Sequence, residues 1–179
     1  LLSTFVAGKD VLNMFCYTGG FTVYALMGGA ALVHSGDSST QAVELINHNV
    51  ALNMDTPGMH QAFVAEAFTF LNDIHGRYDV IILDPPAFAK HQDALKNALQ
   101  AYKRLNAKAI EQIRPGGLVF TFSCSQVVTR DNFRKSVFAA SANTGRHVRL
   151  LYQLSQPPDH PVSIYHPEGE YLKGLVLQV

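Results

Sequence analysis

The sequence is poor in the features that mark secreted, metal-binding or membrane proteins. It has 179 residues but only two cysteines and no tryptophan. The cysteines, Cys16 and Cys124, stand in separate motifs, and no cysteine or histidine spacing suits a metal site. There is no apolar run of about 18 residues or more and no charged-then-apolar leader. We therefore expect a soluble, cytoplasmic chain with no disulfide, no metal and no membrane contact.

The sequence also lacks an excess of charge of either sign. Lysine plus arginine and aspartate plus glutamate number 14 each, so the formal net charge is zero. No overall basic field draws the chain to nucleic acid. A few basic residues are candidates for phosphate contact, although a solvated face is the more common reason for such charges: Arg130, Arg134, Lys135, Arg146 and Arg149. The sequence does not indicate an oligomeric state.

The residues that are present fit one α/β domain spanning 1–179, with 47% hydrophobic residues to build its core. Apolar runs of strand length alternate with segments of helical periodicity. The predicted strands are 11–15, 31–35, 61–65, 78–83, 118–122, 148–154 and 171–179. The predicted helices are 21–27, 41–53, 70–75, 93–114 and 127–142, with a turn at 54–59 around Pro57-Gly58. The pattern predicts a doubly wound, seven-stranded, mostly parallel sheet.

The connection before the last predicted strand differs from the others. The segment 156–169 is rich in proline and has no helical pattern. A right-handed parallel crossover normally contains a helix. We therefore expect the last strand to run antiparallel to its neighbour.

The first strand leads into a glycine turn, Thr18-Gly19-Gly20, before helical spacing begins at Phe21. Glycines let a ligand approach the backbone closely, and a helix start offers unpaired N–H groups. The turn lacks both the Gly-x-Gly-x-x-Gly dinucleotide pattern and the lysine of a phosphate loop. It favours a nucleoside-like ligand without a polyphosphate, and an ordinary strand–helix turn is the alternative.

Acidic residues follow the next two strands. Asp37 could accept hydrogen bonds from ribose hydroxyls of a nucleoside bound across the first turn. Its neighbours Ser38 and Ser39 could equally cap the following helix. Glu66 could accept a bond from a nucleobase amine while Phe68 packs on the ring, or it could simply favour a helix start.

The fourth strand ends in Asp84-Pro85-Pro86-Ala87-Phe88. Prolines cannot continue a sheet ladder, so the chain must leave the sheet at this point. Ligands of open α/β sheets bind outside these strand ends. Asp84, Phe88 and the Pro85 carbonyl could grip a planar substrate, and a proline-stiffened turn capped by Asp84 is the alternative.

Several motifs follow one another along nearly the whole chain: 13–21, Asp37-Ser38, 84–88, 121–125 (Thr-Phe-Ser-Cys-Ser), 159–161 (Asp-His-Pro) and 168–174 (Glu-Gly-Glu-Tyr-Leu-Lys-Gly). Together they resemble one known family, the bacterial RlmI-type 23S ribosomal RNA cytosine-5 methyltransferases. The resemblance implies a Rossmann-like class I methyltransferase fold, S-adenosylmethionine as cofactor and a ribosomal RNA substrate.

The resemblance also implies roles for individual residues. The loop 13–20 would pass the methionine part of the cofactor, Asp37 would hold the ribose, and Glu66 with Phe68 would lie near adenine. The implied cofactor residues are Asn13, Phe15, Tyr17, Thr18, Gly19, Gly20, Asp37, Ser38, Glu66, Ala67, Phe68 and Asp84. Asp84 would face the methyl donor and the target base, with Pro85, Pro86 and Phe88 on the substrate. Two residues depart from the pattern: Asn13 stands where many class I enzymes have an acidic residue, and Glu66 where family members commonly have aspartate.

Full-length relatives resemble a fusion of this domain with an N-terminal RNA-binding PUA domain and a small β-rich domain. We therefore expect 1–179 to be the C-terminal part of a longer protein. Most of the RNA affinity would then lie outside 1–179, which agrees with its zero formal charge. RNA binding by the fragment alone is expected to be weak.

The chemistry of cytosine carbon-5 calls for a nucleophile, because this carbon is itself a poor one. A thiolate that adds to carbon-6 makes carbon-5 reactive, and Cys124 at the end of the fifth strand fits that role. Asp84 would hydrogen-bond the ring and stabilise the adduct. The alternative for Cys124 is a small buried hydrophobe, and Cys16 is interpreted as a packing residue.

Two rival functions stay open. Asp-Pro-Pro-aromatic also occurs in methyltransferases of exocyclic amines, where no cysteine acts. The second rival is a methyltransferase-like module that binds RNA or protein without turnover. A dehydrogenase is disfavoured, because the first loop lacks the dinucleotide glycines.

Overall fold

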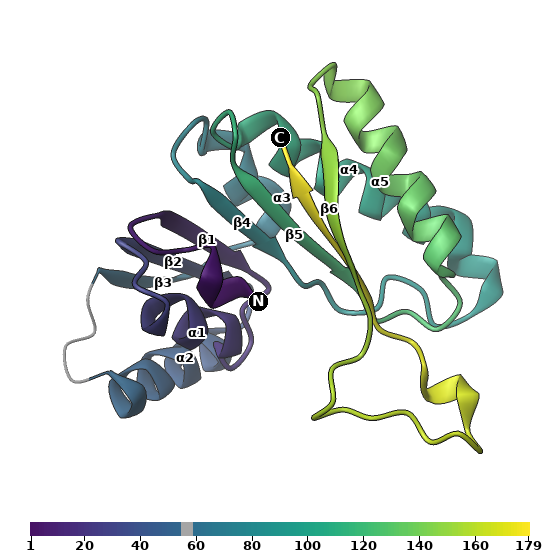
Figure 1. Ribbon diagram of the computed structural model, residues 1–179, viewed down its shortest axis with the longest axis horizontal. Helices are drawn as coiled ribbons and strands as arrows, with labels where there is room; N and C mark the ends of the chain where they lie inside the picture. Colours follow the sequence, from purple (N-terminus) through teal and green to yellow (C-terminus); the bar gives the residue numbers. More distant parts are fainter. Residues whose placement is uncertain (55–58) are drawn as a thin grey trace.

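A computed structural model describes residues 1–54 and 59–179 and shows a sheet between two layers of helices (Figure 1). The strands are β1 (Asp10–Met14), β2 (Leu32–Asp37), β3 (His60–Val64), β4 (Val80–Leu83), β5 (Leu118–Ser123), β6 (Arg149–Leu154) and β7 (Lys173–Gln178). They form one seven-stranded sheet in the order β3-β2-β1-β4-β5-β7-β6. The strand order therefore reverses between β1 and β4, which is where ligands bind in such sheets.

The predicted fold class is confirmed. β1 pairs in parallel with β2 and β4, β2 with β3, and β4 with β5. β7 is the exception: it lies between β5 and β6 and is antiparallel to both.

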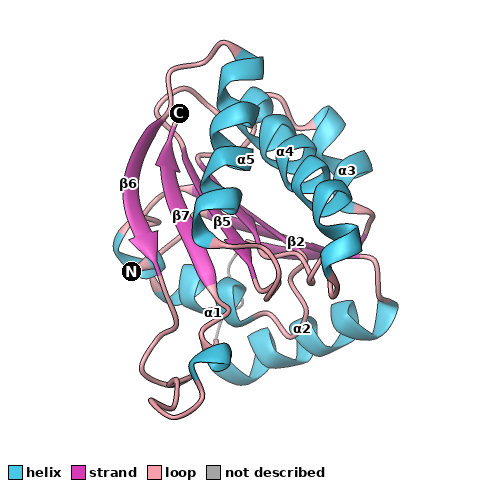
Figure 2. Ribbon diagram, turned by 90° about the vertical axis from the view of Figure 1, so that its right-hand side faces the viewer, coloured by secondary structure: helices cyan, strands magenta, loops and turns pink. Residues whose placement is uncertain are grey.

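Helices cover both faces of the sheet (Figure 2). α1 (Gly20–Met27) and α2 (Thr40–Asn53) pack on one face, and α3 (Ala67–Phe70), α4 (Leu95–Gln112) and α5 (Arg130–Thr144) pack on the other. Short 3₁₀ turns lie at Leu2–Thr4, Leu71–Asp73, Gln92–Ala94 and Pro167–Gly169. None of the helices within 1–54 and 59–179 is both long enough and apolar enough to span a membrane.

Side-chain caps decide where three of the helices begin. Ser39 accepts from the Ala42 N–H, Glu66 from Thr69, and Thr129 from Asn132. The predicted helix 70–75 was therefore placed too late, because the Glu66 cap starts α3 at Ala67 and the 3₁₀ turn follows it. The predicted helix 127–142 was placed too early for the same reason. The predicted turn at 54–59 falls mostly on residues outside the described ranges.

The strands have the alternation expected of a sheet covered on both faces. Along β1, Val11 belongs to the core beneath α1 and α2, whereas Leu12 and Met14 belong to the core beneath α3, α4 and α5. All three side chains are fully buried. This double burial fixes the register of β1 and thereby the position of the loop that follows it.

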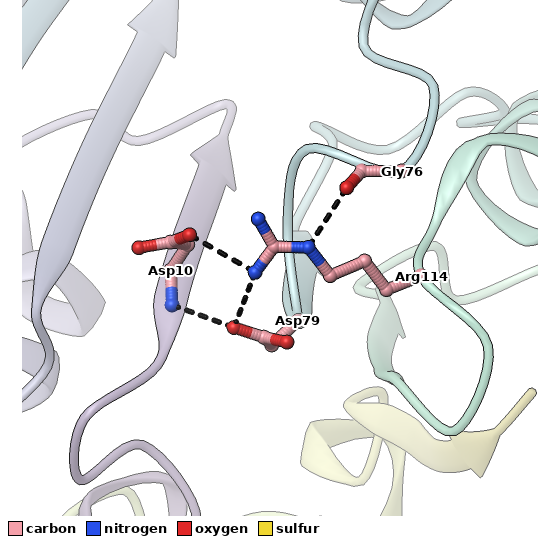
Figure 3. Close-up of polar contacts among 4 residues, drawn as sticks. All are labelled: Asp10, Gly76, Asp79 and Arg114. Carbon is pink, nitrogen blue, oxygen red and sulfur yellow. Dashed lines mark hydrogen bonds and ion pairs between the residues drawn. The ribbon is translucent and has the colours of Figure 1, made fainter.

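At the amino ends of the strands, charged groups form a closed network (Figure 3). The Arg114 guanidinium contacts the carboxylates of Asp10 and Asp79 at 3.0 and 2.9 Å, and its Nε donates to the Gly76 carbonyl at 2.8 Å. Asp79 also accepts the Asp10 N–H at 2.9 Å. Partial burial raises the pKa of Asp79. The hydrogen bonds from the Asp10 N–H and the Arg114 guanidinium lower it, and the net result is a pKa below the usual value. The network joins β1, β4 and the end of α4.

Candidate active site

The loop between β1 and α1 has a rare backbone conformation. Phe15 and Tyr17 have φ values of 59° and 45°, in the left-handed region that side chains with a Cβ seldom adopt, and Gly19 has 85°. Two backbone bonds hold the loop: Cys16 N–H donates to Gly36 O at 3.2 Å, and Gly19 N–H donates to Cys16 O at 2.8 Å. Such conformations persist only where the surroundings impose them, and they gather at binding sites.

Packing against α2 explains why glycine stands at Gly19. A Cβ on this residue would lie 2.3 Å from Cγ1 of Ile46, whereas a Cβ on Gly20 would meet nothing within 4 Å. The Asn49 side chain on α2 also donates to the Thr18 carbonyl at 2.7 Å. Packing by Ile46 and the hydrogen bond from Asn49, both on α2, thus fix the position of the glycine turn.

Asp37 joins the first loop to the end of β2. Its carboxylate accepts the Tyr17 N–H at 3.1 Å and the Ser39 N–H at 3.0 Å, one on each oxygen. A carboxylate has about four acceptor positions, so capacity for further donors is left. Of the two serines considered as caps, Ser39 caps α2, and Ser38 is exposed.

Asn13 points into the protein. It is 1% exposed, and its amide donates to Thr22 Oγ1 at 3.0 Å; Thr22 in turn bonds Ser35 at 2.7 Å, and Ser35 bonds His60 at 3.2 Å. The Asn13 Oδ1 is buried and has no partner among the described residues. The side chain therefore supports the loop from within.

Glu66, Ala67 and Phe68 lie together at the end of β3. The Glu66 carboxylate accepts from the Thr69 N–H at 2.8 Å and from its hydroxyl at 3.1 Å, so it caps α3. Ala67 is buried, and Phe68 packs against the core while staying partly exposed. The helix-start role of Glu66 is thus observed, and the Oε1 atom of its carboxylate takes no part in these bonds.

Asp84 follows β4, and its carboxylate accepts no hydrogen bond from any described residue. Burial raises its pKa to about 6. Asp84 lines a cavity of about 510 Å³. The walls of this cavity include Phe21 and Phe122, whose rings stack with centroids 5.3 Å apart.

The residues after Asp84 divide between core and surface. Pro85 is buried and Pro86 is exposed. The Phe88 ring packs against Tyr102 of α4, with centroids 4.6 Å apart. Phe88 thus contacts the core beneath α4.

The two cysteines occupy different environments. Cys124 follows β5, is partly exposed, and lies with its Sγ 3.9 Å from the Pro85 carbonyl oxygen. Burial and the nearby Asp84 raise the pKa of the Cys124 thiol. Cys16 is buried in the core beneath α1 and α2, where burial raises its pKa to about 12. A packing role for Cys16, as predicted, agrees with this burial.

The sequence interpretation gave no role to Lys173, which the structure places beside Cys124. This lysine is 6% exposed, and its Nζ donates to the Ser125 carbonyl at 2.7 Å. A lysine that opens an apolar strand, Lys-Gly-Leu-Val-Leu, was the available signal. Within the described part of the chain, no group of three or more histidine, cysteine, aspartate or glutamate side chains is placed to hold a metal ion.

The structure therefore brings the predicted site residues to one edge of the sheet. Asp37 ends β2, Asp84 follows β4 and Cys124 follows β5, all at carboxyl ends of parallel strands. Asn13 and Phe88 belong to the same edge, with their side chains turned toward the interior.

Comparisons with known proteins agree with this arrangement. The sequence profile of the S-adenosylmethionine-dependent methyltransferases matches residues 2–175. A Shewanella amazonensis protein named ribosomal RNA large subunit methyltransferase I is 43% identical over 98% of this chain and 45% of its own length. The Tolumonas auensis protein of the same name is 42% identical over 95% of this chain and 44% of its own. The chain thus spans less than half the length of these relatives.

Solved structures lead to the same family. A Streptococcus mutans protein assigned as an S-adenosylmethionine-dependent methyltransferase superposes with a TM-score of 0.84 at 26% identity, covering 99% of this chain and 46% of its own. The structure of another protein assigned as a methyltransferase, with bound S-adenosylhomocysteine, also gives a TM-score of 0.84, at 27% identity, over 99% of this chain and 47% of that one. With the sequence match over nearly the whole chain, these findings show that the chain belongs to the S-adenosylmethionine-dependent methyltransferase family.

Proposed function

We propose that this chain is the catalytic domain of an enzyme that methylates carbon-5 of a cytosine in 23S ribosomal RNA through a cysteine adduct. The observation that carries the proposal is the meeting of Asp84 and Cys124 at neighbouring strand ends, with the Cys124 thiol on the Pro85 carbonyl. The relatives at 43 and 42% identity are named for the same RNA subunit. This similarity supports ribosomal RNA of the large subunit as the substrate. Asp84 and Cys124 support methylation through a cysteine adduct.

The described residues fit S-adenosylmethionine, which supplies a methyl group on a positively charged sulfonium. The Asp37 carboxylate is accessible and has acceptor capacity left for ribose hydroxyls. The Asp84 carboxylate has no bond from the described residues, so it can face a cation or a donor. Backbone groups of the loop from Phe15 to Gly20 are fixed in a shape that a bound molecule can contact.

The chain's own residues would act in a defined order. The Cys124 thiolate adds to carbon-6 of the ring, forming a carbon–sulfur bond and making carbon-5 electron-rich. Asp84 hydrogen-bonds the ring and stabilises the adduct, and carbon-5 then accepts the methyl group. Solvent water takes the carbon-5 proton, the electrons of that carbon–hydrogen bond re-form the double bond between carbon-5 and carbon-6, and the carbon–sulfur bond breaks to release the thiolate. The target base must first leave its stack to reach Cys124.

A variant pair tests the covalent step in the full-length protein. Cys124→Ala should lose cytosine methylation and keep S-adenosylmethionine binding, because the first loop is untouched. Cys16→Ala is the matched control and should keep most of its activity, since Cys16 lies in the opposite core. RNA containing 5-fluorocytosine should trap the parent enzyme covalently and leave Cys124→Ala free. Normal methylation by Cys124→Ala would rule out the covalent mechanism.

Methylation of an exocyclic amine is the second candidate, and one observation favours it. The pKa of Cys124 is raised, so its thiol is protonated in the resting protein. Methylation of an amine needs no thiolate and is therefore compatible with this protonation. In that case Asp84 and the Pro85 carbonyl would accept from the amine. Liquid chromatography of the product nucleoside against 5-methylcytidine and N4-methylcytidine standards separates the carbon-methylated from the nitrogen-methylated product, which have the same mass. A non-catalytic binding module is the remaining rival, and failure to bind S-adenosylhomocysteine in calorimetry would favour it.

RNA binding should depend on the part of the protein outside 1–179, which we propose is N-terminal to this domain. With zero formal charge, the fragment should bind RNA weakly, and the full-length protein should bind it more tightly with a steep loss of affinity in salt. Filter binding of both at two salt concentrations measures this. Tight, salt-insensitive binding by the fragment would contradict it. A cytoplasmic location stays an expectation from the sequence.

A further inference from the structure

Lys173 lies in an unusual place for a lysine. It is the first residue of β7, and only 6% of its surface is exposed. The sheet register pairs it with Ser123, the last residue of β5, so Lys173 stands beside the point where the chain turns into Cys124. The insertion of β7 next to β5 is what brings the two residues together.

The Lys173 ammonium is held by neutral groups. Its Nζ donates to the carbonyl oxygens of Ser125 and Tyr171, each at 2.7 Å. None of the carboxylates in 1–54 and 59–179 forms an ion pair with it. A buried cation without a counter-charge costs free energy, and the nearby Arg130 adds repulsion. Sheet stability alone therefore does not explain a lysine here.

Opposite charges act on the Cys124 thiol. Burial and Asp84 raise its pKa, whereas Lys173 lowers it. The Tyr102 phenol faces Cys124 and Asp84. Arg130, which forms an ion pair with Glu170, faces Lys173. Burial lowers the pKa of Lys173 to about 8, so the side chain still carries most of its charge at neutral pH.

We propose that Lys173 is a positioning residue whose ammonium stabilises the Cys124 thiolate and whose bond to the Ser125 carbonyl fixes the segment that carries it. The proposal rests on the proposed function, in which Cys124 attacks as a thiolate. The S–H bond of Cys124 breaks, its electron pair stays on sulfur, and the proton passes to solvent water. Lys173 keeps its own protons and touches no reacting atom.

The reactivity of the thiol tests this without RNA. The rate of Cys124 alkylation by iodoacetamide is measured against pH by mass spectrometry of the Cys124 peptide. Lys173→Gln removes the charge and keeps an amide donor. It should slow alkylation at pH 7.5 about tenfold and raise the midpoint by about one unit. Lys135→Gln is the matched control, because Lys135 is exposed on α5 and pairs with Asp131. An unchanged rate and midpoint in Lys173→Gln would overturn the proposal.

A second variant decides the matter if Lys173→Gln does not fold by circular dichroism. Lys173→Arg keeps its charge at every pH used, whereas lysine loses it above about pH 8. Its alkylation midpoint should therefore equal the parent's or lie below it, and a higher midpoint in the folded variant refutes the electrostatic role. The alkylation result is independent of product chemistry. If Cys124→Ala still methylates RNA, the proposed function fails while the thiol result stands.

Discussion

The two ends of the sheet treat their charged side chains in opposite ways. At the amino ends, Arg114 satisfies Asp10 and Asp79 together (Figure 3). At the carboxyl ends, Asp84 accepts no bond from the described residues and Lys173 bonds only carbonyl oxygens. The pKa of Asp79 is lowered and that of Asp84 is raised to about 6.

This difference separates charges that stabilise the fold from charges that cost stability. A carboxylate with a lowered pKa favours folding at neutral pH, and one with a raised pKa opposes it. Strained or unpaired groups that survive in a folded protein tend to lie where binding or catalysis needs them. We therefore propose that the carboxyl ends are the functional edge, and substitutions at the two ends should have opposite outcomes.

The largest effect is expected from Asp84→Asn. Methylation by the full-length protein should fall by on the order of 10²–10³, the scale of losing one group that stabilises developing charge. The variant should nevertheless be more stable than the parent at pH 7, by about 1–2 kcal/mol, because the raised pKa opposes folding of the ionised form. Single-turnover assays and urea unfolding give the two values. If Asp84→Asn were less stable than the parent and still active, the Asp84 charge would serve the fold rather than the reaction.

The pH dependence of the Asp84→Asn difference has a defined sign. A group with a raised folded pKa contributes stability below its unfolded value and loses it as pH rises through the folded value. For Asp84 these values are 3.8 and about 6. The stability gap between variant and parent should therefore close at pH 4 and open between pH 4 and 6 in urea titrations.

The second effect concerns Asp37→Ala and cofactor affinity. Loss of ribose hydrogen bonds should weaken S-adenosylmethionine binding by about 1.5–3 kcal/mol, which calorimetry measures. NAD should not bind comparably. Glu44→Ala, exposed on α2, is the control and should bind like the parent. Parent-like binding by Asp37→Ala would show that the carboxylate only ties Tyr17 to Ser39.

A third, smaller effect comes from the glycine turn. Gly19→Ala places a Cβ against Ile46 and forces a side chain into a left-handed backbone, so the free energy of unfolding should fall by about 1–3 kcal/mol. Gly20→Ala meets open space and should be close to neutral. Equal losses for the two alanines would show that packing against α2 is not what requires glycine at Gly19.

The smallest effect is expected at the amino ends. Arg114→Met should cost about 1 kcal/mol of stability and leave methylation unchanged, because the Arg114 side chain is 38% exposed and solvent screens its ion pairs. Arg104→Met, exposed on α4, is the control. Stability from a carboxyl with a lowered pKa is present above 3.8 and lost as pH falls, so the Arg114→Met deficit should shrink in acid. A loss of methylation in Arg114→Met would show that the amino ends of the strands also contribute to activity.

Much of the fold could be predicted from the sequence because its signals are local. The apolar run before Asp84 gave β4, and the unpatterned segment before Tyr171 gave the antiparallel last strand. The start of α3 could not be predicted well, because the sequence leaves Glu66 open as a ligand residue or a helix-start residue, and its capping bond to Thr69 is seen only in the structure. The order of the strands depends on contacts between distant segments, which periodicity does not encode.

The candidate site divides in the same way. Asp37, Asp84 and Cys124 could be placed at strand ends because each comes within a few residues of an apolar run of strand length. Their roles toward cofactor and base stay predictions. Lys173 was overlooked, because its burial arises only when β7 inserts beside β5, about 50 residues earlier in the chain.

The insertion of β7 between β5 and β6 also dictates an order of assembly. β6 is made before β7, yet among the described strands β6 pairs only with β7. During synthesis β6 must therefore wait, and β5 stays an open edge able to pair with another chain until β7 arrives. Because Lys173 opens β7, the surroundings of Cys124 are completed only in this late step. A nascent chain would thus carry the loop from Phe15 to Gly20 long before it could carry the completed surroundings of Cys124.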